Sequence, residues 1–127
     1  MFVSGFTFIN SAVRFDYPIV EAIQSIMPLC DEVVVAVGDA QDGTRALIEC
    51  IDSDKIRIVD TVWDHSLREG GRVLAVETDK AYAHISPQAD WAVYIQGDEV
   101  LHEQDLPAIR EAMELSLIHI LTLPTKA

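Results

Sequence analysis

Four short apolar segments punctuate the chain, and polar or amphipathic stretches separate them. They are Phe2–Ile9, Val33–Val37, Lys55–Val59 and Trp91–Ile95. Their Val, Ile and aromatic content is typical of β-strands. Val33–Val37 has no alternating polar residue, which indicates a strand buried on both faces, as in a parallel sheet. We expect Phe2–Ile9 and Trp91–Ile95 to be buried strands as well.

Helical spacing of apolar residues appears between the predicted strands. Ile19, Ile23, Ile26 and Met27 follow Pro18, so we expect a helix that ends near Met27 before the next proline. Residues 10–17 are expected to form a polar connection. Further helices are expected at Thr44–Ile51, Arg72–His84 and Leu106–Met113. This alternation predicts an α/β protein with a Rossmann-like, mostly parallel open sheet that is flanked by helices.

The C-terminal segment departs from the pattern before it. Leu115–Ile120 contains no acidic residue and resembles the translation of a sequencing-library adapter, and residues 121–127 resemble its continuation. We therefore expect one domain over residues 1–114 and a non-native tail over residues 115–127. The alternative is a genuine short strand followed by a tail.

Charge and composition limit the possible partners. The 127 residues carry 9 Lys and Arg against 21 Asp and Glu, a net charge of −12, which disfavours binding to nucleic acid. No apolar run is long enough to span a bilayer, and no signal peptide is evident, so we expect a cytoplasmic protein. Cys30 and Cys50 are expected to be buried free thiols.

Polar residues gather after the predicted strands. These segments are Asn10–Arg14, Gly38–Thr44, Trp63–Arg72 and Gln96–Glu99. In open α/β sheets, ligands bind at the carboxyl ends of the strands near a switch in strand order. The sequence therefore predicts a small-ligand site at this edge.

Each candidate residue also has a purely structural interpretation. Asp98 and Glu99 suit a hard divalent cation that bridges phosphate oxygens, or they cap the next turn. Asp39 suits a ribose hydroxyl or a base, or it belongs to an ordinary loop in which Asp42 caps the next helix. Arg72 suits a diphosphate, or it is solvated helix charge close to acidic residues such as Glu77 and Asp79.

Several segments together resemble the opening of a family 2 glycosyltransferase. The first is Pro18–Val35 with Asp42-Gly43-Thr44, and the later ones are Leu67–Arg72 and Trp91–Val100. The resemblance covers about residues 3–112. It implies that residues 1–114 are the nucleotide-sugar-binding half of a GT-A domain, truncated after the metal-motif strand and the following helix. It also implies transfer of a sugar from a UDP- or GDP-linked donor to an unknown acceptor, with Mg²⁺ or Mn²⁺ on the diphosphate.

The resemblance assigns roles position by position. Asp98 falls on the second Asp of the family's Asp-x-Asp metal motif, and Glu99 follows as a second metal ligand. Residues expected to bind the donor are Asn10, Arg14, Asp39, Arg72 and Gln96.

The sequence departs from the family at three points. The first acid of the metal motif is Gln96, and Gly38 shifts the acidic residue after the second strand to Asp39. The catalytic base is expected beyond Glu114, so the chain is expected to bind donor without turning over alone.

Two other classes use a similar sheet. A non-catalytic doubly wound module of the receiver type carries an acidic pair after its first strand, which Phe2–Asn10 lacks. A nucleotidyltransferase carries a glycine-rich basic loop there, and Asn10–Arg14 contains no glycine. A purely structural domain without a ligand is a further alternative.

Overall fold

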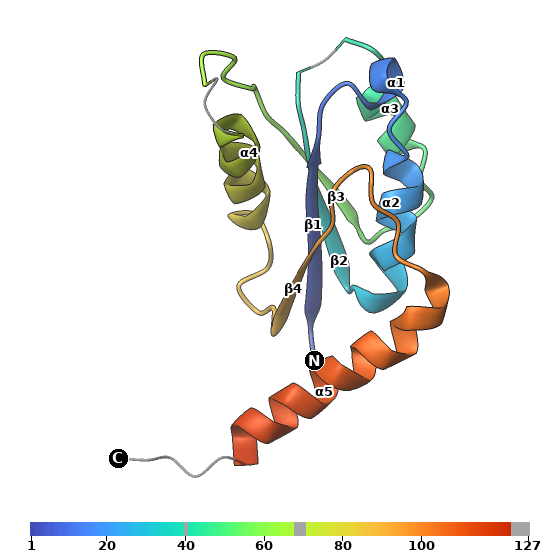
Figure 1. Cartoon of the computed structure of the whole chain (residues 1–127), viewed down its shortest axis with the longest axis vertical. Helices are drawn as coiled ribbons and strands as arrows, with labels where there is room; N and C mark the ends of the chain where they lie inside the picture. Colours follow the sequence, from blue (N-terminus) through green and yellow to red (C-terminus); the bar gives the residue numbers. More distant parts are fainter. Residues whose placement is uncertain (40, 68–70, 123–127) are drawn as a thin grey trace.

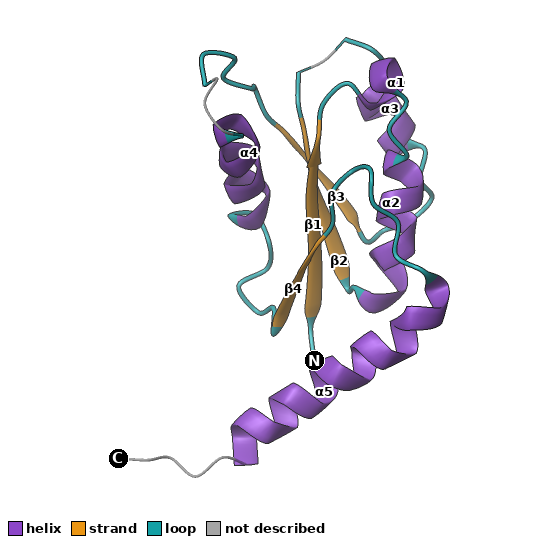
Figure 2. Ribbon diagram, in the orientation of Figure 1, coloured by secondary structure: helices purple, strands orange, loops and turns teal. Residues whose placement is uncertain are grey.

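The computed structural model describes residues 1–39, 41–67 and 71–122, with side chains up to Leu117. A single sheet of four parallel strands lies at its centre (Figures 1 and 2). In chain order the strands are β1 (Val3–Ile9), β2 (Glu32–Val37), β3 (Ile56–Asp60) and β4 (Trp91–Tyr94). Their spatial order is β3-β2-β1-β4, so the order reverses between β1 and β4.

Helices cover both faces of the sheet. Helices α1 (Ala12–Phe15), α2 (Ile19–Ile26) and α3 (Thr44–Glu49) lie on one side of the sheet in Figure 1, and α4 (Arg72–Tyr82) lies on the other. Short 3₁₀ turns span Met27–Leu29 and Glu103–Asp105. Helix α5 (Leu106–Thr122) crosses near the end of the sheet where the N-terminus lies. The predicted α/β, Rossmann-like architecture with helices flanking a parallel sheet is confirmed.

Alternation along β1 and β2 separates two cores. On the face covered by α2, Val33, Val35 and Val37 pack with Ile19 and Ile23. On the opposite face Phe6, Val34 and Ala36 pack with Ala81 of α4. Every residue of β2 except Glu32 is buried, as its unbroken apolar run predicts.

The prediction for the last strand was wrong in its burial. β4 lies at an edge of the described sheet and pairs with β1, so Trp91 and Val93 are partly buried whereas Ala92 and Tyr94 are exposed. β-branched and aromatic residues suit a half-buried strand as well as a central one, which is why composition did not distinguish the two.

Two helices and one thiol also differ from expectation. Residues 10–17 contain the short helix α1, bounded by Ser11 and Asp16 with φ of 60° and 57°. Helix α5 extends past Met113 to Thr122, so the described part of the tail is helical and forms no strand. Cys30 is buried, and burial raises its pKa to about 12, but Cys50 is exposed.

Candidate functional site

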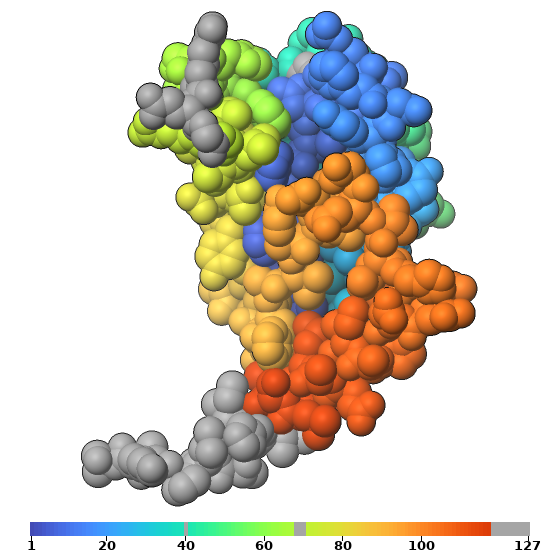
Figure 3. Space-filling view, in the orientation of Figure 1, coloured from blue at the N-terminus to red at the C-terminus, as the bar shows by residue number. Residues whose placement is uncertain are grey.

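A cavity of about 590 Å³ opens at the carboxyl ends of β1 and β4, where the strand order reverses. This is the place where open α/β sheets bind ligands. In Figure 3 the orange segment that follows β4 lies over the blue N-terminal region, between α4 and the blue helices. The loop after β3 and the first turn of α4 complete the wall through Trp63, His65 and Val73.

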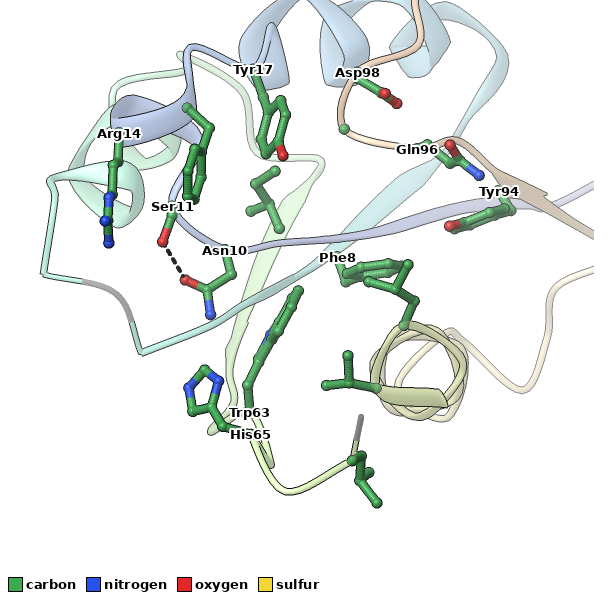
Figure 4. Close-up of a pocket in the computed structure, with 16 residues that line it drawn as sticks. Phe8, Asn10, Ser11, Arg14, Tyr17, Trp63, His65, Tyr94, Gln96 and Asp98 are labelled. Atoms are coloured by element: carbon green, nitrogen blue, oxygen red, sulfur yellow. Dashed lines mark hydrogen bonds between the residues drawn. The ribbon is translucent and has the colours of Figure 1, made fainter. Parts of the chain in front are cut away.

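The structure gathers Asn10, Arg14, Gln96 and Asp98 in this cavity (Figure 4). Asn10 Oδ1 accepts a hydrogen bond of 2.9 Å from the Ser11 hydroxyl. This contact orients the Asn10 side-chain amide at the end of β1. The Arg14 guanidinium carbon lies 5.2 Å from the centroid of the Phe15 ring, a cation–π contact.

The turn after β4 sets the position of Asp98. A Cβ on Gly97 would lie 2.7 Å from Ile9 Cδ1, so glycine allows the turn to pack directly on the end of β1. Glu99 Oε1 accepts the Gln96 amide hydrogen at 2.9 Å and closes the turn. Glu99 therefore has the capping role that the structural interpretation expected, while its role as a metal ligand stays a prediction. Asp98 lines the cavity, and its carboxylate has no hydrogen-bond partner among the described residues.

The described side chains of this cavity supply only part of a ligand set for a divalent metal ion. Within the described ranges, no group of three or more His, Cys, Asp or Glu side chains is placed to hold a metal ion. Magnesium sites that include substrate phosphates commonly use one or two carboxylates. Asp98 fits that arrangement, because its carboxylate is unpartnered within the described part of the chain and lines a cavity of about 590 Å³.

Two predicted donor residues lie elsewhere. Asp39 is exposed and lines a second cavity of about 300 Å³ at the ends of β2 and β3, together with Arg45 and Asp60. The Asp60 carboxylate accepts from Arg45 Nε at 2.7 Å, and this hydrogen bond lowers the pKa of Asp60. Arg72 is exposed at the start of α4 and lines neither described cavity. Residues 68–70 of the resemblance lie outside the described residues.

Aromatic side chains form most of the remaining wall, which the sequence did not single out. They are Phe8, Phe15, Tyr17, Trp63 and Tyr94. The Phe8 ring centroid lies 6.0 Å from that of Trp63 and 6.5 Å from that of Tyr94, and the planes of Phe8 and Tyr94 differ by 14°. The alternation of side chains along strands could have indicated Phe8 and Tyr94, since both lie near the ends of their strands on the same face of the sheet. Trp63 belongs to a loop, where no periodic pattern could indicate it.

The loop that carries Trp63 is fixed from two directions. Thr61 Oγ1 donates to Glu77 Oε1 of α4 at 2.7 Å, and Lys80 Nζ donates to the Val62 carbonyl oxygen at 3.0 Å. Beyond Trp63, the Ser66 hydroxyl and amide donate to Asp64, which lowers the pKa of that carboxyl. Trp63 therefore follows a segment that is anchored to α4 and precedes a turn held by local hydrogen bonds.

Comparison with solved structures gives three matching chains. Among them, the crystal structure of S. aureus TarS 1-349, a glycosyltransferase, aligns with a TM-score of 0.64 and 15% sequence identity, over 91% of this chain and 33% of that chain. The chain therefore has a glycosyltransferase-like fold and spans about a third of the TarS chain. No protein-family model and no curated protein matches the sequence. In the described part of the chain, no helix is long and apolar enough to cross a membrane.

Proposed function

We propose that the chain is the donor-binding part of a glycosyltransferase. In this proposal the cavity at the β1 and β4 ends binds a nucleotide-diphospho-sugar, linked to UDP or GDP, whose sugar is transferred to an acceptor. The observation that carries the proposal is the position of Asp98. Its carboxylate has no hydrogen-bond partner among the described residues and lines a cavity at the strand-order switch of a glycosyltransferase-like fold.

Charge supports a metal in this role. The chain has a net charge of −12, and Arg14 is the one Lys or Arg among the described residues that line the cavity. A diphosphate would meet little positive charge there. Asp98 would hold Mg²⁺ or Mn²⁺ together with the phosphate oxygens, and a bound metal screens the diphosphate and stabilises it as a leaving group.

The other side chains have distinct roles in the proposal. Arg14 lies on the opposite side of the cavity from Asp98 and would pair with a phosphate oxygen (Figure 4). Asn10 and Gln96 would donate or accept hydrogen bonds to the donor. Glu99 holds the turn through Gln96, and we propose it as a second metal ligand through its free oxygen. The catalytic base, an Asp or Glu, stays a prediction for the acceptor half of the enzyme, since residues 115–127 contain no acidic residue.

Thermal unfolding with ligands tests this function. We expect UDP- or GDP-sugars to raise the midpoint in the presence of Mn²⁺ or Mg²⁺, and EDTA to abolish the shift. Asp98→Asn should remove the metal-dependent part of the shift. Asp54→Asn provides a matched control, because Asp54 is an exposed carboxylate near the opposite end of β3.

The variant Glu99→Gln separates the two roles of that residue. Its amide oxygen can still accept the Gln96 N–H, so the turn is kept while the charge is lost. Loss of the metal-dependent shift in this variant would support coordination by Glu99. A wild-type chain that is stabilised by no nucleotide-sugar, with or without metal, would contradict the proposed function and favour a non-catalytic doubly wound module.

A further inference from the structure

Trp63 occupies the space directly over the carboxyl end of β2. A Cβ added to Gly38 would lie 2.8 Å from Trp63 Nε1 and 2.7 Å from Asn10 Nδ2, so only glycine lets both side chains approach this backbone. The Trp63 Nε1 atom is buried and has no hydrogen-bond partner among the described residues. Figure 4 shows Trp63 beside Asn10 and opposite Phe8.

This packing determines which atoms of the Trp63 ring a ligand can contact. Since its nitrogen is inaccessible, the part of the half-buried ring that lines the cavity is carbon. Such a surface interacts with a ligand through dispersion and π-stacking and makes no hydrogen bond to it. The anchors at Thr61 and Val62 hold the loop before Trp63, so little side-chain freedom remains to be lost on binding.

Trp63 and Asn10 line the larger cavity, and both approach Gly38, which lines the smaller one. Gly38 and Asp39 line the smaller cavity, whereas Asn10, Trp63 and Asp98 line the larger one. Trp63 and Asp98 therefore share one cavity, and Asp39 lines the other.

We propose that Trp63 is the residue that binds the nucleobase of the donor, by stacking inside the larger cavity, and that Asp39 makes no contact with the base. This inference rests on the proposed function and concerns how the nucleobase of the donor is bound. Stacking on an aromatic ring is available to every base and is tolerant of base identity. Purine and pyrimidine nucleoside diphosphates should therefore both bind, and both should depend on Trp63.

Fluorescence reports on the stacking directly. The chain contains two tryptophans, so Trp91→Phe leaves Trp63 as the single reporter. Trp91 belongs to the core on the α2 face, away from Phe8 and Trp63. Titration of this variant with UDP and with GDP in Mg²⁺ should quench the Trp63 emission. An unchanged emission while calorimetry detects binding would overturn the proposal.

Affinities of matched variants give a second, independent readout. We expect Trp63→Leu to weaken both UDP and GDP by roughly 5- to 150-fold, the range measured for loss of one base–aromatic stack. Trp63→Phe should lose less because it keeps a ring. Gly38→Ala should also weaken both, since its Cβ displaces the indole. Asp39→Asn should stay within about two-fold of wild type if it makes no contact.

The outcomes also separate this inference from the function on which it depends. A large loss of UDP binding in Asp39→Asn, with Trp63→Leu unaffected, would overturn the stacking role and leave donor binding intact. A wild-type chain that binds neither nucleotide would overturn the proposed function and this inference together. Thermal midpoints of the variants identify any affinity change that arises from unfolding.

Discussion

Glu77 is a carboxylate in an environment that a lone charge would avoid. It is fully buried, and its two oxygens accept from Thr61 Oγ1 at 2.7 Å and Lys80 Nζ at 2.6 Å. Lys80 also donates to the Val62 carbonyl oxygen, which places one cation between α4 and the loop after β3. A buried charge of this kind is tolerated only when it is paired and hydrogen-bonded. At the residue scale, this cluster holds the loop that presents Trp63.

Removing the cation tests the cluster. Lys80→Met should lower the free energy of unfolding by about 3 kcal/mol, because it leaves the Glu77 carboxylate buried with Thr61 as its remaining described partner. Urea denaturation measures the change. Asp79→Ala, an exposed position on the same helix, should stay within about 0.5 kcal/mol of wild type. Equal effects of the two substitutions would show that the buried pair has no special role.

The sequence did not reveal the cluster. Glu77, Asp79 and Lys80 are close together on one predicted helix, and the simplest expectation was solvated charge. Only the position of α4 against β1 and β2 decides which of these charges is turned inward. Because Thr61 is far away in sequence, no local spacing could have indicated its hydrogen bond to Glu77.

At the scale of elements, one short segment joins two helix starts. Asp42 Oδ2 accepts the Arg14 amide hydrogen of α1 at 2.9 Å, and Asp42 Oδ1 accepts the Thr44 amide hydrogen of α3 at 3.1 Å. The Thr44 hydroxyl accepts the Val13 amide hydrogen at 3.3 Å. The first amides of a helix have no partner within it, so these contacts satisfy both starts. Asp42 was expected to cap α3, and the structure adds α1, which carries Arg14.

Asp42 gives a pH-dependent prediction. Desolvation raises its pKa, but the hydrogen bonds from the Thr44 hydroxyl and from the Arg14 and Thr44 amides outweigh it, so the folded pKa lies below the usual value for an aspartate. A carboxyl with a lowered folded pKa stabilises the protein above its unfolded pKa and loses that contribution as pH falls.

Asp42→Ala should therefore lower the free energy of unfolding by about 1–2 kcal/mol at pH 7. The difference from wild type should begin to narrow below about pH 4, where the carboxyl of the unfolded chain becomes protonated, and it should shrink further as pH falls through the lower folded pKa. Urea denaturation at several pH values measures both effects. Asp42→Asn keeps an acceptor oxygen without a titrating group, so a pH profile of this variant identical to wild type would contradict the assignment.

The elements themselves were largely predictable because their core faces follow simple periods. β2 and α2 bury the residues that their apolar patterns indicate. Helix α1 has only four residues and lies between two left-handed residues, so no period could identify it. The predicted form of helix α5 is too short, because its expected end lies close to the last acidic residue, Glu114. Good helix formers such as Leu continue beyond that residue, and the helix continues with them.

At the scale of the whole molecule, α5 contributes to the main core through its first half. Met113 is buried, and Leu106 and Ile109 are partly buried against the same cluster, whereas Leu115 is 57% exposed. This distribution agrees with the expectation that residues 1–114 form the domain, which stays a prediction. Within the described side chains of α5, the apolar contacts to the core come before residue 115.

A pair of shortened chains tests the domain boundary. A chain that ends at Glu114 should keep a thermal midpoint within about 4 °C of the full chain, since it loses no described core side chain. A chain that ends at Asp105 loses Leu106, Ile109 and Met113, and it should be destabilised by several kcal/mol. A large drop in midpoint already at Glu114 would show that residues 115–127 belong to the fold.

The sequence by itself determined the fold class and the edge of the sheet where polar residues gather. Both follow from local period and from the rule that parallel strands bring their carboxyl ends together. Only the tertiary structure decided which of those residues share a cavity. Strand order brought Asn10, Arg14, Gln96 and Asp98 into one cavity, and it left Asp39 in another. Which strand ends are adjacent depends on long-range strand pairing and on side-chain volume. Neither leaves a periodic pattern along the sequence.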